Sequence, residues 1–222
     1  MAWSRTFTQM KTDIGLWLGV DPDSSNPNTT RLPTDVRASC VQQARRELAL
    51  RRDLRFLEDT DTITTASGDY DYGLPSDWLR PYYAYYLGSD GSFVDIAFLT
   101  RAEWDEKYAE DLSSETGSPV HICVYGDEYL VGPVPDAIYS IYVHYFKQPV
   151  DLTGSNDDDF LTFCWEPIFW GACLRACDYL MEDTRRPIFQ ARYDEAVKYM
   201  TTQEARAKWS ARRLVSKISK GL

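Results

Sequence analysis

The sequence predicts an α+β protein in which helices from both ends of the chain form a bundle and a small antiparallel β-subdomain is inserted between them. Apolar residues recur at helical spacing before residue 56 and after residue 157, whereas the period between them is two, as in strands. The segment Pro167–Glu182 is apolar except for one narrow polar stripe, which is typical of a helix surrounded by other helices. The two helical regions must therefore pair to bury their apolar faces.

We expect four segments. Residues 1–55 supply the N-terminal helices of the bundle, 56–156 the β-subdomain with one short helix, 157–205 the C-terminal helices, and 206–222 a basic arm. The first twenty residues lack the apolar run and the cleavage site of a signal peptide, and no stretch is long enough to cross a membrane. We therefore expect synthesis in the cytoplasm.

Two helices are predicted in the N-terminal segment. Thr8–Leu18 has apolar residues at helical spacing, with Thr6 as a candidate N-cap. Asp35–Arg55 follows Thr34, a second candidate N-cap, and several of its faces carry arginine. Because no aromatic residues interleave with these arginines, they indicate a solvated or subunit-facing surface rather than a nucleic-acid site.

Period-two segments separated by Gly, Asp and Pro turns predict seven strands. They are Thr62–Thr65, Tyr70–Leu74, Tyr82–Leu87, Ser92–Phe98, Val120–Tyr125, Tyr129–Val131 and Ile138–Lys147. A capping box beginning at Thr100 predicts a short helix through Glu110. Tyrosine is concentrated in this region, which suits a sugar-binding or base-binding platform, but tyrosine is also favoured in strands and interfaces. We favour the interface interpretation.

The C-terminal part returns to helix. Leu152–Phe163 is predicted to be helical, with the run Asp157-Asp158-Asp159 near the N-terminus, and Pro167 is predicted to begin the central helix. A last helix is expected from Pro187. Past Glu204 the chain is basic and lacks acidic residues, so we expect a loosely tethered arm that orders on a partner.

The net charge of −10 is unevenly distributed. Residues 56–159 contain 4 basic and 21 acidic side chains (−17), so this region is expected to repel a nucleic-acid backbone.

Motifs for catalysis, metals and cofactors are not evident. The two histidines lie in predicted strands, the five cysteines form no C-x-x-C pair, and no phosphate-binding or nucleophile motif is present. We therefore expect no enzyme activity, no metal and no cofactor. Paired carboxylates such as Asp59 and Asp61, together with the Tyr-rich sheet, leave one alternative, a carbohydrate-binding or glycoside-hydrolase-like protein.

One series of short motifs resembles a known family. It begins with the arginine-bearing helix, Leu74-Pro75-Ser76-Asp77-Trp78 before a hairpin with Asp90-Gly91 at its tip, the Trp104–Tyr108 helix and Gly117-Ser118-Pro119. It continues with Gly132-Pro133-Val134-Pro135-Asp136, the strand Tyr142-Val143-His144-Tyr145 and the Pro167–Leu180 helix. Over residues 33–200 this pattern resembles the head-to-tail adaptor proteins of tailed bacteriophages.

The resemblance implies a structural protein of the virion neck, made in the host cytoplasm. Such adaptors form a ring, typically of twelve subunits, beneath the portal, contact the next tail component, and let DNA pass without binding it specifically. The C-terminal segment of the family commonly reaches the portal. Carried over by position, this docking arm would use Lys208, Arg212, Arg213, Lys217 and Lys220. Candidates for subunit contacts are Arg37, Arg45, Arg52, Tyr82 and Tyr85.

Overall fold

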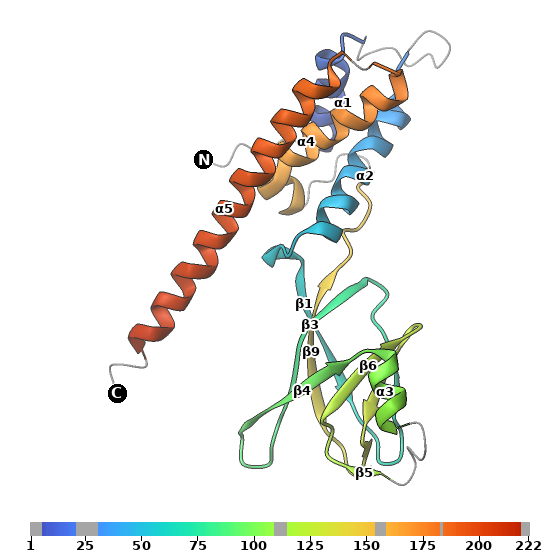
Figure 1. Cartoon of the computed structure of the whole chain (residues 1–222), viewed down its shortest axis with the longest axis vertical. Coiled ribbons are helices and arrows are strands. Elements are labelled where there is room, and N and C mark those ends of the chain that lie inside the picture. The colour runs from blue at the N-terminus through green and yellow to red at the C-terminus, as the bar shows by residue number, and fades with distance from the viewer. Residues whose placement is uncertain (1–5, 21–30, 109–114, 154–158, 183, 219–222) are drawn as a thin grey trace. The chain divides into compact units, whose positions relative to one another are not determined.

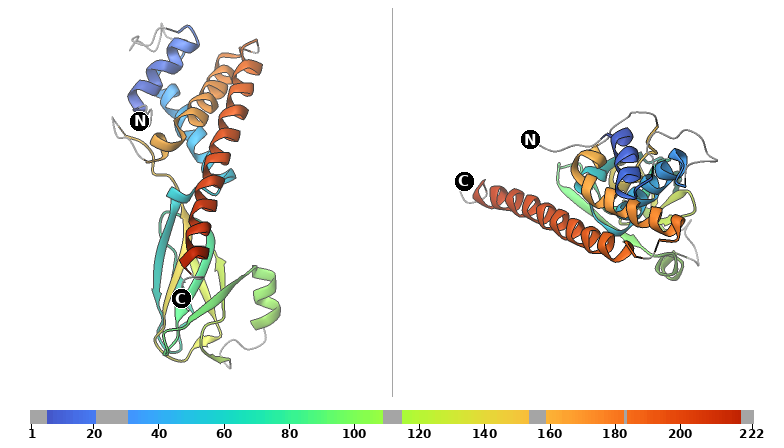
Figure 2. Two further views of the ribbon diagram at one scale, coloured as in Figure 1. Left: turned by 90° about the vertical axis from the view of Figure 1, so that its left-hand side faces the viewer. Right: turned by 90° about the horizontal axis from the view of Figure 1, so that it is seen from above.

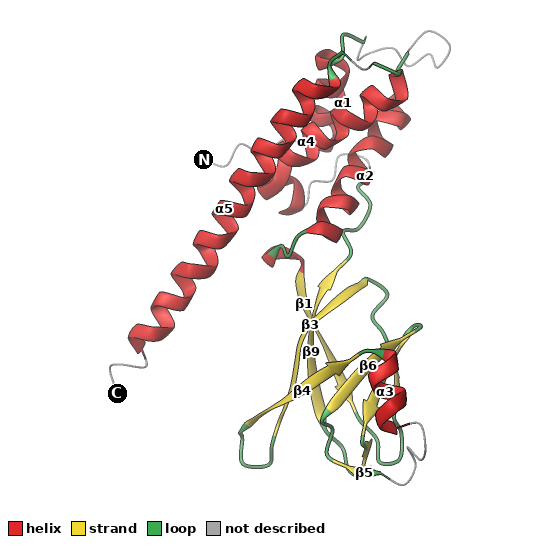
Figure 3. Cartoon of the chain, in the orientation of Figure 1, coloured by secondary structure: helices red, strands yellow, loops and turns green. Residues whose placement is uncertain are grey.

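A computed structural model describes residues 6–20, 31–108, 115–153, 159–182 and 184–218, without the side chains of residues 159, 160 and 206–218. Contacts divide the chain into two compact units. The helical unit comprises Met1–Phe56 and Pro149–Leu222, and the sheet unit comprises Leu57–Gln148. In the described part of the chain, every strand belongs to the sheet unit (Figure 3).

Four helices build the helical unit: α1 (Phe7–Trp17), α2 (Thr34–Arg51), α4 (Asp159–Leu180) and α5 (Arg186–Ile218). Helix α4 contacts the other three (Figure 1), and its residues Ile168, Ala172 and Cys173 are fully buried. The prediction that Pro167–Glu182 belongs to a central, surrounded helix is therefore confirmed. Helix α5 runs antiparallel to α4 and continues past its first turns (Figure 2).

The N-terminal helices follow the sequence closely. Thr6 caps α1 in a full capping box with Gln9, as its hydroxyl accepts from the Gln9 amide at 3.1 Å. The N-cap prediction for α2 is wrong, because Thr34 is already helical and Pro33 holds the cap position without a side-chain bond. Helix α2 also ends at Arg51, four residues before the predicted end.

Helix α4 unites two segments that the sequence separates. A non-helical residue, Cys164 with φ of −125°, kinks the helix three residues before Pro167. Proline has no N–H and its ring clashes with the preceding turn, so the helix bends where Pro167 lies inside it. The predicted helix from Leu152 is not observed at its start, since Leu152 and Thr153 are coil. Asp157 and Asp158 lie outside the described residues.

The sheet unit contains nine strands and one α-helix among its described residues. The strands are β1 (Glu58–Thr64), β2 (Asp71–Gly73), β3 (Trp78–Leu87), β4 (Phe93–Leu99), β5 (Thr116–Gly117), β6 (His121–Tyr125), β7 (Glu128–Gly132), β8 (Val134–Pro135) and β9 (Ser140–Lys147). A seven-stranded sheet has the order β1-β9-β3-β4-β6-β7-β2, and β5 pairs with β8 separately. The 3₁₀ turn η1 (Arg55–Leu57) precedes β1, and α3 (Arg101–Tyr108) follows β4.

The predicted fold class, a helical bundle with a small antiparallel β-subdomain, is wrong in this region. The main sheet has seven strands and is mixed, because β4 and β6 pair in parallel from Ala97 opposite His121 to Leu99 opposite Cys123. The cause is α3, which lies between these two strands in sequence. A helix that connects two strands carries the chain back along the sheet, so the strands run in the same direction.

One buried cluster forms the core of the sheet unit. Ile141 and Val143 of β9 pack there with Ala84 of β3, Ile122 of β6 and Val131 of β7. Because these residues come from distant positions in the strand order, the sheet curls around them. The predicted alternation along β9 is confirmed, since Tyr142 and His144 point to the other face and are only partly buried.

Candidate functional site

Two of the arginines predicted to contact other subunits are used inside the chain. Arg37 is 1% exposed, and its guanidinium donates to the carbonyls of Leu32 at 3.1 Å and Lys11 at 3.2 Å. It thereby joins the start of α2 to the end of the preceding loop and to α1. A buried guanidinium needs such acceptors, since an unpaired charge is costly to bury.

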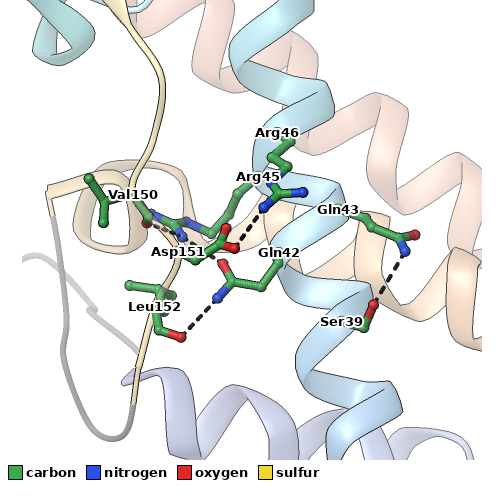
Figure 4. A network of polar contacts seen from close by, with 8 residues as sticks. All are labelled: Ser39, Gln42, Gln43, Arg45, Arg46, Val150, Asp151 and Leu152. Carbon is green, nitrogen blue, oxygen red and sulfur yellow. Dashed lines mark hydrogen bonds and ion pairs between the residues drawn. The ribbon is translucent and has the colours of Figure 1, made fainter. Parts of the chain in front are cut away.

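Arg45 plays the same role farther along α2 and is also 1% exposed. Its Nη1 donates to Gln42 at 2.8 Å and to the Val150 carbonyl at 3.0 Å, while the Gln42 amide donates to the Leu152 carbonyl at 2.8 Å (Figure 4). Together these bonds hold the segment that returns from the sheet unit against α2. Arg45 is therefore occupied within its own chain.

The remaining arginine, Arg52, follows α2 and is exposed. It lines a hollow of about 290 Å³ together with Leu54, Met200 and Glu204. The neighbouring Arg51 pairs with Glu47 at 2.8 Å, and Glu47 also pairs with Arg175 of α4. This end of α2 thus combines an internal ion-pair network with a solvent-accessible cation.

A larger hollow, of about 660 Å³, lies between the first turns of α4 and the middle of α5. We call it the α4–α5 groove; its lining includes Phe163, Cys164, Pro167, Tyr199, Met200 and Glu204. One carboxylate oxygen of Glu204 is buried and has no hydrogen-bond partner among the described residues. The groove could not be predicted from the sequence, because it depends on the kink at Cys164. The exposed aromatic residues that line it are Phe163 and Tyr199.

The sheet unit presents a row of aromatic rings on the face opposite its core. The rings of Tyr83, Tyr85 and His144 lie near one another, with centroid distances of 6.1 Å (Tyr83–His144), 5.7 Å (Tyr85–His144) and 5.7 Å (Tyr83–Tyr85), and Tyr85 also stacks on Tyr142 at 5.3 Å. We call these four residues the aromatic ladder. Neighbouring aromatic rings of this kind stabilise the paired strands that carry them.

The predicted contact residues Tyr82 and Tyr85 lie in this part of β3. Tyr85 belongs to the ladder, whereas Tyr82 packs edge-on against Phe146 at 5.5 Å and remains largely exposed. Phe93 of β4, also exposed, extends the aromatic surface with a centroid 5.1 Å from Tyr85. Exposed aromatic side chains of this kind are enriched in protein interfaces.

The charge of the sheet unit is strongly negative. Residues 57–148 contain 4 basic and 17 acidic side chains, a net charge of −13. Three of the four cations already contact acidic or aromatic groups: Lys147 pairs with Asp59 at 2.9 Å, Arg101 pairs with Asp105 at 2.8 Å, and Arg80 lies over Phe146. The Lys147 bond lowers the pKa of Asp59, which keeps it ionised.

Both histidines lie within hydrogen-bond distance of hydroxyl groups, and the cysteines are buried. The Tyr108 hydroxyl lies 2.7 Å from Nδ1 of His121, and burial, with the nearby Lys107 charge, lowers the pKa of this histidine. The Thr60 hydroxyl lies 2.8 Å from Nδ1 of His144. All five cysteines are buried, and burial raises the pKa of Cys177 to about 11. Within the described ranges no group of three or more His, Cys, Asp or Glu side chains is placed to hold a metal ion.

The predicted docking arm is only partly described. Its backbone through Ile218 is the last part of α5, but the side chains of Lys208, Arg212, Arg213 and Lys217 lie outside the described structure, and Lys220 lies outside the described residues altogether. None of the helices that the structure describes is both long and apolar enough to span a membrane.

A comparison with protein families gives one match. The family described as SU10 adaptor protein matches residues 5–216, which includes both units and most of α5. No curated protein matches the chain.

Proposed function

Because this chain belongs to the SU10 adaptor protein family, we propose that it is a head-to-tail adaptor that forms a ring beneath the portal of a phage capsid. Adaptors of this family are structural components of the phage virion rather than enzymes. In the proposed role the ring joins the DNA-filled head to the next tail component, and DNA passes through it. The observation that carries the proposal is the family match over nearly the whole chain.

The surfaces of both units support a role in protein contacts. The exposed aromatic residues of the sheet unit, Tyr82 and Phe93 among them, suit subunit or partner contacts. Of the predicted contact arginines, Arg52 is the one exposed to solvent.

The charge distribution supports the passage of DNA. A net charge of −13 on the sheet unit disfavours binding of phosphates, so a lumen lined by this unit would let DNA slide without holding it. We assign the lumen to the sheet unit on this ground. Neutralising the carboxylates on its surface should raise the affinity of the ring for DNA.

The basic end of α5 is the proposed contact with the portal. Past Glu204 the sequence contains six lysines and arginines and no acidic residue, on a backbone that is helical through Ile218. A cationic helix of this kind suits an acidic surface on a partner. Docking by such an arm makes assembly sequential, because the arm finds its site only on a finished portal.

Deleting residues 208–222 tests this assignment. We expect the truncated chain to keep its helical content and melting temperature but to lose binding to purified portal rings, measured by electron microscopy as an added ring of density. A full-length control replaces Lys208, Arg212, Arg213, Lys217 and Lys220 by Gln, which removes the charge and keeps the helix. Docking by the truncated chain would show that the arm is not the contact.

A further inference from the structure

Helices α4 and α5 form an antiparallel pair whose two ends carry different surfaces. Cys164 near the start of α4 contacts Met200 of α5, whereas Trp170, farther along α4, stacks on Phe189 near the start of α5. The α4–α5 groove therefore lies at one end of the pair, and the turn between the helices lies at the other. About 25 Å of helix separates them, at a rise of roughly 1.5 Å per residue.

The turn end is an exposed apolar knob. Met181 is 89% exposed and Ile188 is 61% exposed, although both are large apolar side chains. Tyr179, two residues before Met181 at the end of α4, is also exposed. We call these three residues the α4–α5 knob. Apolar side chains gathered in this way on a surface indicate a contact with another molecule.

Two arginines flank Ile188 of the knob, and one of them is held only loosely. Arg185 and Arg192 lie on the same stripe of α5 as Ile188, at spacings of three and four residues. Arg185 reaches Glu182 at 3.8 Å and Arg192 reaches Glu195 at 3.7 Å. Arg185 also donates to the Trp17 carbonyl at 3.2 Å, which ties it to the end of α1. The long ion pair of Arg192 joins two exposed side chains and contributes little, so the Arg192 guanidinium is available to a stronger partner.

The groove offers the complementary features. Phe163 and Tyr199 line it and are 63% and 62% exposed, which provides apolar area for Ile188 and Met181. Glu166 and Glu204 are its carboxylates, and the buried Glu204 oxygen has no partner among the described residues. A buried carboxylate oxygen without a donor is a costly arrangement that an arginine from outside would relieve.

We propose that the α4–α5 knob of one copy of this chain docks in the α4–α5 groove of the next copy. A second copy is the occupant because the knob supplies apolar side chains flanked by arginine, and the groove supplies exposed aromatic rings beside the Glu204 oxygen that lacks a donor among the described residues. Since each copy has one knob and one groove, the contact is head-to-tail, and repeated head-to-tail contacts close into a ring when the rotation between copies fits. The inference rests on the proposed ring and names the surfaces that build it.

Disulfide trapping in the full-length chain tests this contact. Ile188→Cys and Tyr199→Cys place one thiol on the knob and one beside the groove. The two positions lie about 16 Å apart along α5, too far for a bond within one chain, and the five native cysteines are buried. After mild oxidation we expect the double variant to form a ladder of dimers, trimers and larger species on non-reducing gels, both alone at high concentration and on portal rings.

Mixing experiments establish the direction of the contact. A chain with only Ile188→Cys or only Tyr199→Cys carries a new thiol on one side of the contact. A mixture of the two single variants should therefore give a crosslinked dimer and nothing larger. A matched control pairs Tyr199→Cys with Ile138→Cys, an exposed apolar residue of the sheet unit, and should give no ladder. In the double-cysteine background Glu204→Arg should abolish the ladder, whereas Asp194→Arg, an exposed position on another face of α5, should preserve it.

The outcomes separate this inference from the proposed function. A ring seen by electron microscopy without a ladder would overturn the assignment of the knob and groove and leave the adaptor role intact. Absence of any ring on the portal would count against the adaptor role, while a ladder formed by the chain alone would still support the contact. Absence of a ladder in both settings would overturn the inference.

Discussion

Arg45 and Arg46 are neighbours on α2 with opposite surroundings. Arg45 is buried and donates to Gln42 and the Val150 carbonyl, whereas Arg46 is exposed and pairs with Asp151 at 2.6 Å. We expect Arg45→Ala to lower the free energy of unfolding by about 3 kcal/mol, because it removes a buried side chain with a packed stem and takes the donor away from both Gln42 and the Val150 carbonyl. Arg46→Ala should cost less than about 1 kcal/mol, as exposed ion pairs do. Urea unfolding followed by circular dichroism measures both, and equal losses would contradict this account.

The arginines of α2 show how far the exposure of a single residue can be predicted from the sequence. A stripe of arginines on a predicted helix indicates an exposed surface, since charged residues are rarely buried. The acceptors that connect Arg37 and Arg45 to other parts of the chain are the backbone carbonyls of Lys11, Leu32 and Val150. A carbonyl is present at every residue, so nothing in the sequence marks those three as acceptors. The exposed Arg52 and Tyr82, in contrast, lie where the residue type predicts.

At the scale of elements, α3 is attached to the sheet through a close contact at Gly132. A Cβ atom built on Gly132 would lie 2.8 Å from the rings of Trp104 and Tyr108 of α3. These rings pack with Cys123 and Leu130 in a buried cluster and cannot move aside. We expect Gly132→Ala to cost about 1–3 kcal/mol, as overpacking does, and to broaden the NMR signals of α3.

Gly73 provides the matched control. It also lies in a strand, β2, but no atom lies within 4 Å of the position of its Cβ, and its φ is not positive. Gly73→Ala should therefore change stability by less than about 0.5 kcal/mol. A similar loss in the two variants would mean that strand glycines matter here for backbone reasons rather than for the approach of α3.

The elements also show where sequence reasoning reaches its limit. The capping box at Thr100 predicts α3, and the structure confirms it, with Thr100 accepting from the Glu103 amide at 3.3 Å. All seven predicted strands overlap observed ones, while the two-residue strands β5 and β8 carry no periodic signal. The parallel pairing of β4 and β6 was available from the sequence, because a helix between two strands predicts a crossover. The kink at Cys164 could not be predicted from the sequence, because it depends on how the turn around Pro167 packs. The α4–α5 groove depends on this kink and could not be predicted either.

At the scale of the whole molecule, acidic and basic residues are divided between the units. The sheet unit has a net charge of −13, and the rest of the chain has 20 basic and 17 acidic residues, a net charge of +3. The sign of each part was evident from the sequence, because charge depends only on composition. Its consequence for DNA depends on which unit lines the ring, and the composition alone does not determine that arrangement.

The two units should also fold independently. The sheet unit has its own buried cluster, and its ends lie on paired strands, with Glu58 of β1 opposite Phe146 of β9. We expect residues 57–148 alone to give a dispersed ¹H–¹⁵N NMR spectrum and a cooperative melting transition. The helical unit, with residues 57–148 replaced by a short Gly-Ser linker, should remain helical, because α4 still packs on α1 and α2.

The fragment 149–222 serves as the control for this experiment. It keeps α4 and α5 but lacks α1 and α2, so the apolar side of α4 that includes Ala172 and Cys173 would lose part of its cover. Exposure of that surface should leave the fragment unfolded or aggregated. If the fragment folds while the linked helical unit does not, the contacts of α4 with α1 and α2 are not what stabilises the helical unit. If residues 57–148 alone are unfolded, the sheet unit depends on the helices, and the two units form one cooperative domain.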